Sequence, residues 1–412
     1  MDLVIRKSRL QGREGSWDIG IQGDRIAAVA ERLEDQGAEE IEAAGRLVAP
    51  TYVNGHVHLD KCNLGDIMRP NQTYSFRECL EITWEHKRTY TIEDIVERAS
   101  KAIREGILHG TTVFRVFADV DTIGGLRPLE GILALKAKWQ GIVHIEAVDF
   151  PQEAILRDPG TKDLMEEGMR MGADVVGGLP WHEHLDEDVR AHIDFCFELA
   201  KKYDKDIHML VDDTSNPNSR SLEYLAVKTM RENYHGRVSA SHCEALASYD
   251  EMHAQKVMDL VKNAEVSICC NPHISLALIG RHDQEPIRRG ITRVRQLWGK
   301  EVNLFSSQDD VNDPYYPFGR NDQQEVAAYL CHAAHMTFPK EIEAVFDFIT
   351  VNAARALRLQ NYGLTPGCRA DLNVLAAPTF QHTLRLQQPP VWVIRSGKLL
   401  AQNILTRELH MG

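Results

Sequence analysis

Strand-like and helix-like segments alternate through the middle of this sequence, and this alternation limits the fold more than any other feature. Eight short apolar runs are predicted strands: residues 47–53, 111–116, 143–148, 174–177, 206–210, 237–242, 266–269 and 302–306. Eight segments have the amphipathic spacing that is typical of helices: residues 92–105, 129–138, 161–171, 187–202, 221–232, 249–263, 322–335 and 344–357. Strands that alternate with helices of about 10 to 15 residues indicate a parallel sheet. Eight repeats over about 320 residues favour a closed (β/α)8 TIM barrel, since no G-x-G-x-x-G turn supports an open doubly wound sheet.

Both ends of the chain differ from this middle, because their strand-like runs have no helices between them. Such runs lie at residues 3–5, 17–21, 25–29, 370–375 and 391–395. A chain of 412 residues suits a barrel of about 300 residues with a smaller attached domain. We therefore expect a small β-sandwich domain built from residues 1–50 and 366–412, and a barrel over residues 51–365.

Charge and hydropathy exclude several classes of partner. The formal net charge of -13 would repel nucleic acids and anionic membranes, so we expect neither as a partner. No apolar run approaches the roughly 18 residues that span a bilayer, and no basic, apolar leader begins the chain. These features predict a cytoplasmic protein. The eight cysteines show no C-x-x-C spacing, so neither a disulfide framework nor a cysteine zinc site is indicated.

His56 and His58 stand two residues apart at the end of the first predicted strand. Side chains two apart on a strand point to the same side, so both imidazoles can bind one metal ion. The pair alone is a weak signal, because solvated strands also carry such histidines by chance. Its position strengthens the signal, since barrel enzymes keep their chemistry at the carboxyl ends of the strands.

The carboxyl ends of other predicted strands add polar residues to the same rim, namely Gln152, Asp213, His242, Asp309 and Asp310. Each has a structural explanation when taken singly, such as a core histidine or a helix cap. Together they predict metal-assisted hydrolysis. A divalent ion held by imidazoles and a carboxylate lowers the pKa of water from about 15.7 toward 7. Asp213, His242 and Asp309 are placed to move protons or to stabilise charge beside it.

Several long strings carry a resemblance to known enzymes. They are His56-Val57-His58-Leu59-Asp60, Phe150-Pro151-Gln152-Glu153, residues 172–177, Asn271-Pro272, residues 288–294, and Asp309-Asp310-Val311 with residues 313–317. Over nearly the whole chain they resemble the amidohydrolase superfamily, and within it the bacterial cytosine deaminase branch, which is similar to N-isopropylammelide-type triazine amidohydrolases.

This resemblance implies roles for the rim residues. In that family the strand-one histidine pair, a strand-five histidine and the strand-eight aspartate bind one divalent ion, iron or zinc. His56, His58 and Asp309 would therefore be metal ligands, and His242 would contact the attacking water. Gln152 and Asp310 would hold the ring of a small heterocyclic substrate. The resemblance also implies a homo-oligomer.

The sequence departs from the family pattern on one side of the rim. When the sequence is aligned with the family pattern without gaps, Leu210 occupies the position of the strand-five histidine ligand. Asp213 occupies the position of the catalytic glutamate. Phe117 and Gln308 replace two further histidines that are typical of the branch. Leucine cannot bind a metal, so we expect weaker ion binding. Three protein ligands and water nevertheless form a workable catalytic zinc site.

Two compensations for the lost ligand are open. His242 can move inward as a fourth ligand. His208 lies on the same strand face as Leu210, although it should lie about 6 to 7 Å deeper in the barrel. Without either compensation the ion binds weakly or not at all.

We therefore predict a metal-dependent amidohydrolase or deaminase that hydrolyses an exocyclic C–N bond of a small nitrogen heterocycle, such as a cytosine-like aminopyrimidine. Two alternatives remain open. One is a catalytically reduced, metal-poor relative that binds a heterocycle without hydrolysing it. The other is a cyclic amidase. Metal content tests the first alternative, and ammonia release tests the second.

Overall fold

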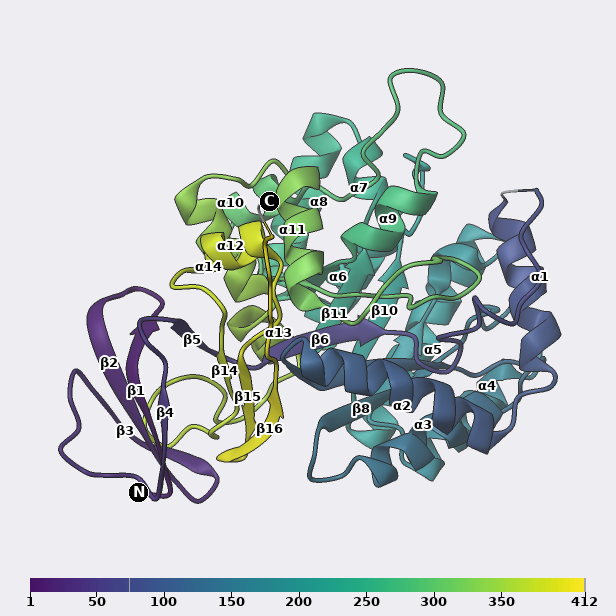
Figure 1. Cartoon of the computed structure of the whole chain (residues 1–412). Coiled ribbons are helices and arrows are strands. Elements are labelled where there is room, and N and C mark those ends of the chain that lie inside the picture. Colours follow the sequence, from purple (N-terminus) through teal and green to yellow (C-terminus); the bar gives the residue numbers. More distant parts are fainter. Residues whose placement is uncertain (74, 411–412) are drawn as a thin grey trace.

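A barrel forms the larger part of the protein (Figure 1). The computed structural model describes residues 1–73 and 75–410. Within these residues, one sheet has eight parallel strands in the order β13-β12-β11-β10-β9-β8-β7-β6. Its strands are β6 (Tyr52–Val57), β7 (Thr111–Asp119), β8 (His144–Phe150), β9 (Val175–Gly178), β10 (Asp206–Val211), β11 (Val238–His242), β12 (Ser267–Cys270) and β13 (Leu304–Ser306). The predicted (β/α)8 barrel is confirmed.

The ring of strands closes through the backbone of Asp309. The Asp309 N–H donates to the carbonyl of His56 at 2.9 Å, and the Asp309 carbonyl accepts from the N–H of His58 at 3.0 Å. A parallel bridge between Val57 and Asp309 belongs to the same contact. The barrel therefore closes between His56, His58 and Asp309, which the sequence predicts to be metal ligands.

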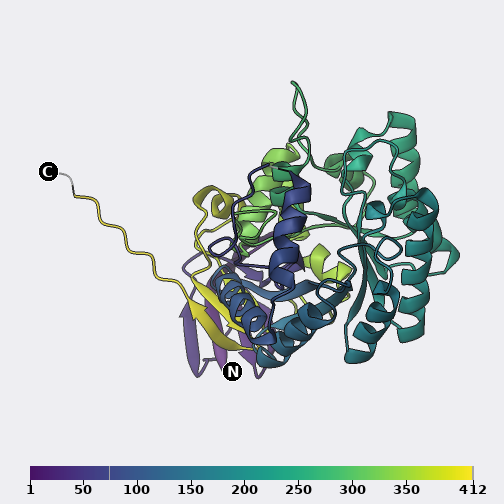
Figure 2. The ribbon, with the colours of Figure 1, turned by 90° about the vertical axis from the view of Figure 1, so that its right-hand side faces the viewer.

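Helices cover the outside of the barrel and line its mouth (Figures 1 and 2). They are α1 (Phe76–Lys87), α2 (Ile92–Leu108), α3 (Arg127–Lys138), α4 (Thr161–Met171), α5 (Asp186–Tyr203), α6 (Ser221–Arg231), α7 (Ala245–Ser248), α8 (Glu251–Asn263), α9 (Pro272–Leu278), α10 (Val294–Gly299), α11 (Gln323–Ala333), α12 (Pro339–Phe348), α13 (Val351–Ala356) and α14 (Phe380–Leu386), with a short 3-10 helix η1 (Pro180–His182). Local chemistry sets their ends. Before α2, the Thr91 side chain accepts from the N–H of Asp94, which satisfies a free donor of the first turn. After α4, Gly172 adopts a φ of 108°, a conformation that glycine reaches without strain.

Strands from the two ends of the chain form a second sheet, with the order β16-β15-β14-β5-β1-β2-β3 and β4 paired to β1. They are β1 (Leu3–Leu10), β2 (Arg13–Gln22), β3 (Arg25–Ala30), β4 (Glu39–Glu42), β5 (Leu47–Pro50), β14 (Leu372–Val374), β15 (Trp392–Arg395) and β16 (Lys398–Gln402). Figure 1 shows the purple and yellow strands side by side, which confirms a small β-domain built from both termini. The last two residues of its predicted C-terminal part, 411–412, lie outside the described residues.

The predicted strand over residues 47–53 is in fact two strands of different sheets. Strand β5 pairs with β14 in the terminal sheet, whereas β6 pairs with β7 in the barrel. The Thr51 N–H still bonds to Asp371 of the terminal sheet, and the next N–H, of Tyr52, bonds to Gly110 just before β7. A continuous apolar run does not mark this change, because both strands are buried. His56 consequently lies inside strand β6.

One predicted helix also divides. Residues 344–357 contribute to two helices, α12 and α13, rather than to one. The backbone leaves the helical region at Thr350, with φ -129° and ψ -102°. This break lets α13 turn to pack against β6 and β13 at the amino-terminal end of the barrel.

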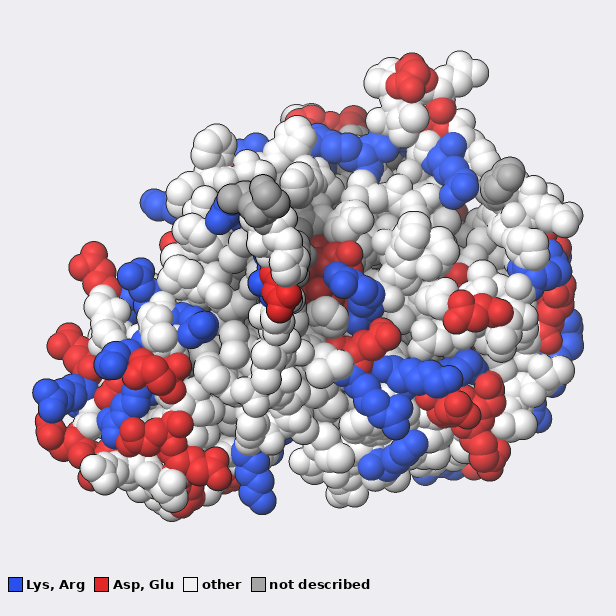
Figure 3. All heavy atoms as spheres, viewed as in Figure 1, with Lys and Arg blue, Asp and Glu red and all other residues white. Residues whose placement is uncertain are grey.

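The surface carries charged side chains of both signs. Figure 3 shows acidic and basic side chains interspersed on one face of the molecule. Across the described residues, no helix has both the length and the apolar character needed to cross a membrane. Beyond β16, the chain extends away from the body of the protein, as Figure 2 shows.

Candidate active site

The residues predicted from strand ends converge at the carboxyl end of the barrel. One pocket, with a cavity volume of about 40 Å³, is lined by His58, Gln152, Asp213, His242, Asp309 and Asp310. His56 is fully buried and contacts His58 beneath them. The rest of the lining is Lys61 and a set of mainly apolar side chains: Phe76, Leu179, Trp181, Leu210, Ile274, Leu278 and Tyr315. This volume is well below the range of about 300 to 1,000 Å³ for small-molecule sites, so lining side chains must move before a ring can enter.

Three donor atoms from His56, His58 and Asp309 form a triangle at the floor of this pocket. The two Nε2 atoms of His56 and His58 lie 3.3 Å apart, and each lies 3.4 Å from Asp309 Oδ1. In a tetrahedral site with bonds of about 2.0 to 2.1 Å, two ligand atoms stand about 3.3 to 3.4 Å apart. The spacing of these three atoms therefore fits one divalent ion.

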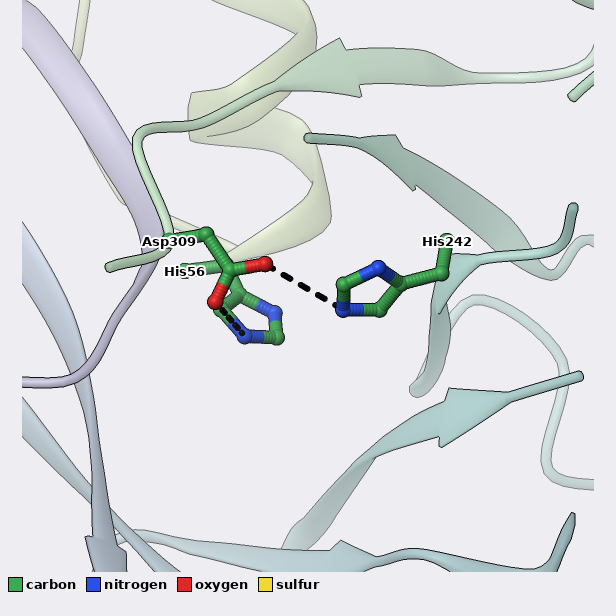
Figure 4. Close-up of side chains that lie close together, drawn as sticks. All are labelled: His56, His242 and Asp309. Carbon is green, nitrogen blue, oxygen red and sulfur yellow. Dashed lines mark ion pairs between the residues drawn. The ribbon is translucent and has the colours of Figure 1, made fainter. Parts of the chain in front are cut away.

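His242 faces the other oxygen of Asp309, as Figure 4 shows. Its Nε2 lies 3.3 Å from Asp309 Oδ2, and its Nδ1 lies 3.5 Å from Asp213 Oδ1 and 3.6 Å from Glu244 Oε1. Asn271 Nδ2 also donates to Asp309 Oδ2, at 2.9 Å. His242 and Asp309 both have positive φ angles, 72° and 68°, which non-glycine residues rarely adopt and which concentrate at functional sites.

Burial sets the protonation of the three triangle residues. It lowers the pKa of His56 and the pKa of His58, so both imidazoles are neutral and keep a lone pair. Burial opposes the ionised form of Asp309, but the nearby His56 and His242 outweigh burial and lower the pKa of this carboxyl below its usual range. Neutral imidazoles and an ionised carboxylate are the forms that bind a divalent ion.

In the cluster around His242, the pKa values of His242 and Asp213 are raised instead. Burial would lower the pKa of His242, but the carboxylates of Asp213, Glu244 and Asp309 outweigh burial and raise it to about 10. Burial raises the pKa of Asp213 to about 7, although the charge of His242 opposes this shift. Near neutral pH, His242 and Asp213 therefore hold an exchangeable proton beside the pocket.

Two of the residues that depart from the family pattern, Phe117 and Leu210, belong to an apolar wall. Phe117 stacks on His56 with ring centroids 4.0 Å apart and an interplanar angle of 17°. Leu210 packs in the same buried cluster with Phe117, Phe150 and Leu179. Leu210 therefore brings no donor atom to the ion site, and Phe117 fixes the plane of one candidate ligand by contact.

The two candidate compensations for Leu210 differ in the described structure. His208 uses both ring nitrogens elsewhere: Nε2 lies 2.6 Å from Ser241 Oγ, and Nδ1 lies 3.4 Å from Arg115 Nη1. His242 Nε2 lies 3.3 Å from Asp309 Oδ2, and the donor atoms of His242, His56 and Asp309 are close enough to one another to hold one ion. Gln308, the third departure, lies 3.1 Å from His273 Nδ1 and donates to the Asp310 carbonyl at 3.2 Å.

Lys61 fixes the orientation of Gln152. Its Nζ donates to Asp119 Oδ1 at 2.8 Å and to Gln152 Oε1 at 3.0 Å, with the lysine side chain 1% exposed. A lysine ammonium can only donate, so the amide oxygen of Gln152 must face Lys61. The amide N–H groups of Gln152 then face the pocket, where they can donate to an acceptor on a ring.

Sequence reasoning assigned no role to Lys61, Glu244 or Asn271, although each contacts a residue that it singled out. Lys61 follows the His56–Asp60 string directly, and Glu244 lies two residues after His242. Both signals were present as charges next to a motif. The burial of these two side chains could not be predicted, because charged side chains are usually solvated.

Comparison with known proteins agrees with this geometry. Residues 80–401 match the Amidohydrolase family. The chain is 27% identical over 407 residues to N-isopropylammelide isopropyl amidohydrolase of Pseudomonas sp. (strain ADP), covering 98% of each. It is 27% identical over 362 residues to pterin deaminase of Rhizobium rhizogenes, covering 87% of this chain and 81% of the relative.

A solved structure extends the comparison to the whole fold. The chain superposes on 5-methylcytosine deaminase from Klebsiella pneumoniae, liganded with phosphonocytosine, with a TM-score of 0.93 and 32% identity over 99% of each chain. These matches confirm the resemblance to the cytosine deaminase and triazine branches. The match to the family covers more than half of the sequence, and this chain belongs to the amidohydrolase family.

Proposed function

We propose that this protein is a metal-dependent amidohydrolase that hydrolyses an exocyclic C–N bond of a small nitrogen heterocycle, a cytosine-like aminopyrimidine or a related ring. One observation carries the proposal. The triangle of His56, His58 and Asp309, with atoms 3.3 to 3.4 Å apart, lies at the floor of a small pocket whose wall holds an exchangeable proton. The relatives named above act on pyrimidine, triazine and pterin compounds, which supports a heterocyclic substrate.

His56, His58 and Asp309 would hold one divalent ion, iron or zinc. Such an ion supplies Lewis acidity, which lowers the pKa of water toward neutrality. The protein itself keeps these three side chains buried and in the protonation states that binding requires.

His242 and Asp213 would manage the protons. In hydrolysis the water oxygen forms a bond to the ring carbon, and the exocyclic C–N bond of that carbon breaks. One proton from the water must reach the leaving nitrogen. Asp213, with a pKa raised to about 7 by burial, would take that proton and deliver it. His242 would hold the attacking oxygen near Asp309 by donating from Nε2.

Gln152 and Asp310 would orient the ring. Because Lys61 occupies the Gln152 oxygen, Gln152 offers N–H donors to a ring carbonyl or an unprotonated ring nitrogen. Asp310 lines the same pocket and would contact another edge of the ring. The apolar wall of Leu179, Trp181 and Leu210 would contact the ring face or an alkyl substituent.

A binding-only relative is the second candidate, and Leu210 is the observation that favours it. The apolar cluster around Leu210 removes a donor from the ion site, so a ligand can bind here without hydrolysis if no ion is held. A cyclic amidase is a third candidate for the same pocket. It would open a ring and release neither ammonia nor an amine.

Amine release tests the proposal. Protein supplied with iron or zinc is incubated with aminopyrimidines and amino-s-triazines, and ammonia or amine is measured. We expect turnover of at least one compound, and a loss of at least about 100-fold for Asp213→Asn, which cannot transfer the proton. Asp259→Asn on the outer helix α8 is the matched control and should retain activity. Ring opening without amine release would support the cyclic amidase, and tight binding without turnover would support the binding-only relative.

A further inference from the structure

A second cavity, of about 210 Å³, lies at the amino-terminal end of the barrel. This end is opposite the candidate active site, because β8 begins at His144 and leads to Gln152. The cavity is lined by Val113 and His144 of barrel strands, by residues 359–363 after α13, and by Arg369, Asp371 and Arg395 in or next to β14 and β15. It therefore lies where the barrel meets the terminal sheet.

Two guanidinium groups share one carboxylate at this junction. Arg395 Nη1 donates to Asp371 Oδ2, and Arg369 Nε lies 3.6 Å from the same oxygen. The other oxygen of Asp371, Oδ1, accepts from the N–H of Ser396 at 2.8 Å. Among the described residues that line the cavity, Asp371 is the one acidic residue. Two positive charges and one negative charge therefore leave one positive charge without a counter-charge.

Burial makes this uncompensated charge unfavourable. The Arg395 side chain is 11% exposed, and its Nε is buried without a hydrogen-bond partner among the described residues. Burial lowers the pKa of Arg395, the charge of Asp371 opposes this shift, and the nearby charge of Arg369 adds to it. A guanidinium does not lose its proton in a protein. The site therefore gains free energy from a bound anion rather than from deprotonation.

Both arginines keep N–H groups for such an anion. Arg395 uses Nη1 for Asp371, and Arg369 uses Nη2 for Ser396 Oγ at 2.9 Å. Within the described part of the chain, Arg395 Nη2 and Arg369 Nη1 have no hydrogen-bond partner. Guanidinium groups bind the oxygens of phosphates and carboxylates through paired N–H groups. The unused donors are thus of the kind that binds an oxyanion.

We propose that this cavity binds a small oxyanion, a phosphate or a carboxylate, between Arg369 and Arg395. The proposal goes beyond the proposed function, since it involves neither the candidate metal ion nor the heterocycle. His144 lines the cavity from the barrel, whereas both arginines belong to the terminal part of the chain. A bound anion would therefore contact both parts of the protein and stabilise their packing.

Equilibrium dialysis of the full-length protein against inorganic phosphate, at constant ionic strength, tests the proposal. We expect the parent to bind about one phosphate, and Arg369→Gln to bind it at least about tenfold more weakly, because a charge-assisted contact is lost. The matched control is Arg32→Gln, which changes an arginine whose side chain is 82% exposed and should bind phosphate as the parent does. His56→Ala, which disrupts the candidate metal site, should also keep the parent affinity. Competition by acetate then shows whether the site prefers phosphate or a carboxylate.

Three results would overturn the proposal. They are no saturable binding of either ion by the parent, equal affinities for the parent and Arg369→Gln, and loss of binding in His56→Ala. The last result would place the anion at the candidate metal site. If Arg369→Gln does not fold, thermal unfolding of the parent and of His56→Ala decides. A saturable rise in Tm with phosphate, but not with chloride at equal ionic strength, supports the proposal in both proteins, and its absence overturns it.

Discussion

Asp309 and His56 are joined through both their backbones and their side chains. The Asp309 N–H donates to the His56 carbonyl at 2.9 Å, and His56 Nε2 lies 3.4 Å from Asp309 Oδ1. The hydrogen bond that closes the barrel thus also sets the spacing of two candidate ligands. Because the first and last strands supply them, the site can form only when the barrel is complete.

Restoring an imidazole at strand five should strengthen ion binding. Leu210 lines the pocket together with His58 and Asp309, so Leu210→His adds a fourth donor on the correct wall. We expect zinc affinity to rise by at least about tenfold, because four protein ligands complete a tetrahedral set. Chelator competition measures the change. Leu179→His, in the same apolar wall, is the control, and equal affinities for the parent and Leu210→His would contradict the expectation.

Removing the amide of Gln152 should weaken ring binding without affecting the ion. Lys61 holds the Gln152 oxygen, so the amide N–H groups face the pocket. In Gln152→Leu, we expect the dissociation constant of a 2-oxo pyrimidine to rise about tenfold, the loss of one hydrogen bond. Calorimetric titration measures it, with the exposed Gln140→Leu as the control. Unchanged ring affinity would show that Gln152 does not contact the ligand.

Asp149 should make the protein less stable as the pH rises. Both of its carboxylate oxygens are buried without a hydrogen-bond partner, and burial raises the pKa of Asp149 well above its usual range. A raised folded-state pKa means that this contribution is complete below the unfolded value, near 3.8, and declines as the pH rises toward the folded value. Asp149→Asn removes the ionisable group, so we expect a gain of about 1 to 2 kcal/mol in unfolding free energy at pH 8. Urea unfolding at several pH values measures the gain, and an equal gain at pH 4 would exclude ionisation as its cause.

Glu183 should have the opposite pH dependence. Burial opposes its ionised form, but His192 and the N–H groups of Ile155 and Leu156 donate to it and lower the pKa of Glu183. Burial also lowers the pKa of His192. Both lowered values mean that stability is fully present above the unfolded pKa values, 6.5 for the histidine and 4.5 for the glutamate, and is lost as the pH falls from these values through the lower folded-state values.

Glu183→Gln tests this dependence. We expect the variant to be less stable at pH 7, by about 1 to 3 kcal/mol, because a charge-assisted acceptor is lost. The difference from the parent should shrink as the pH falls below 4.5, through the lowered folded-state pKa of Glu183. Thermal unfolding across this range measures it, and a difference that is constant with pH would contradict the assignment.

The barrel and most of its rim could be predicted because they depend on patterns that are local in sequence. Eight alternations of strand and helix specify the barrel, and its geometry brings the strand ends together. His56, His242 and Asp309 converge for that reason. That Leu210 supplies no donor atom follows from the residue type alone.

Contacts between distant segments could not be predicted in the same way. The change of sheet at Thr51 depends on which strand each N–H meets, and the apolar run is the same on either side. Lys61, which follows β6, meets Gln152, which follows β8, only after both strands have paired with β7 between them. His208 was weighed as a ligand from its strand face, but the depth of Ser241 between His208 and His56 is a property of the closed barrel.

Bound metal tests the central claim most directly. Elemental analysis is performed on protein purified without chelators, alongside His56→Ala, which removes one corner of the triangle. The account predicts about one equivalent of iron or zinc in the parent and its loss in the variant. A parent without metal, even after incubation with excess iron or zinc, would contradict the hydrolytic mechanism.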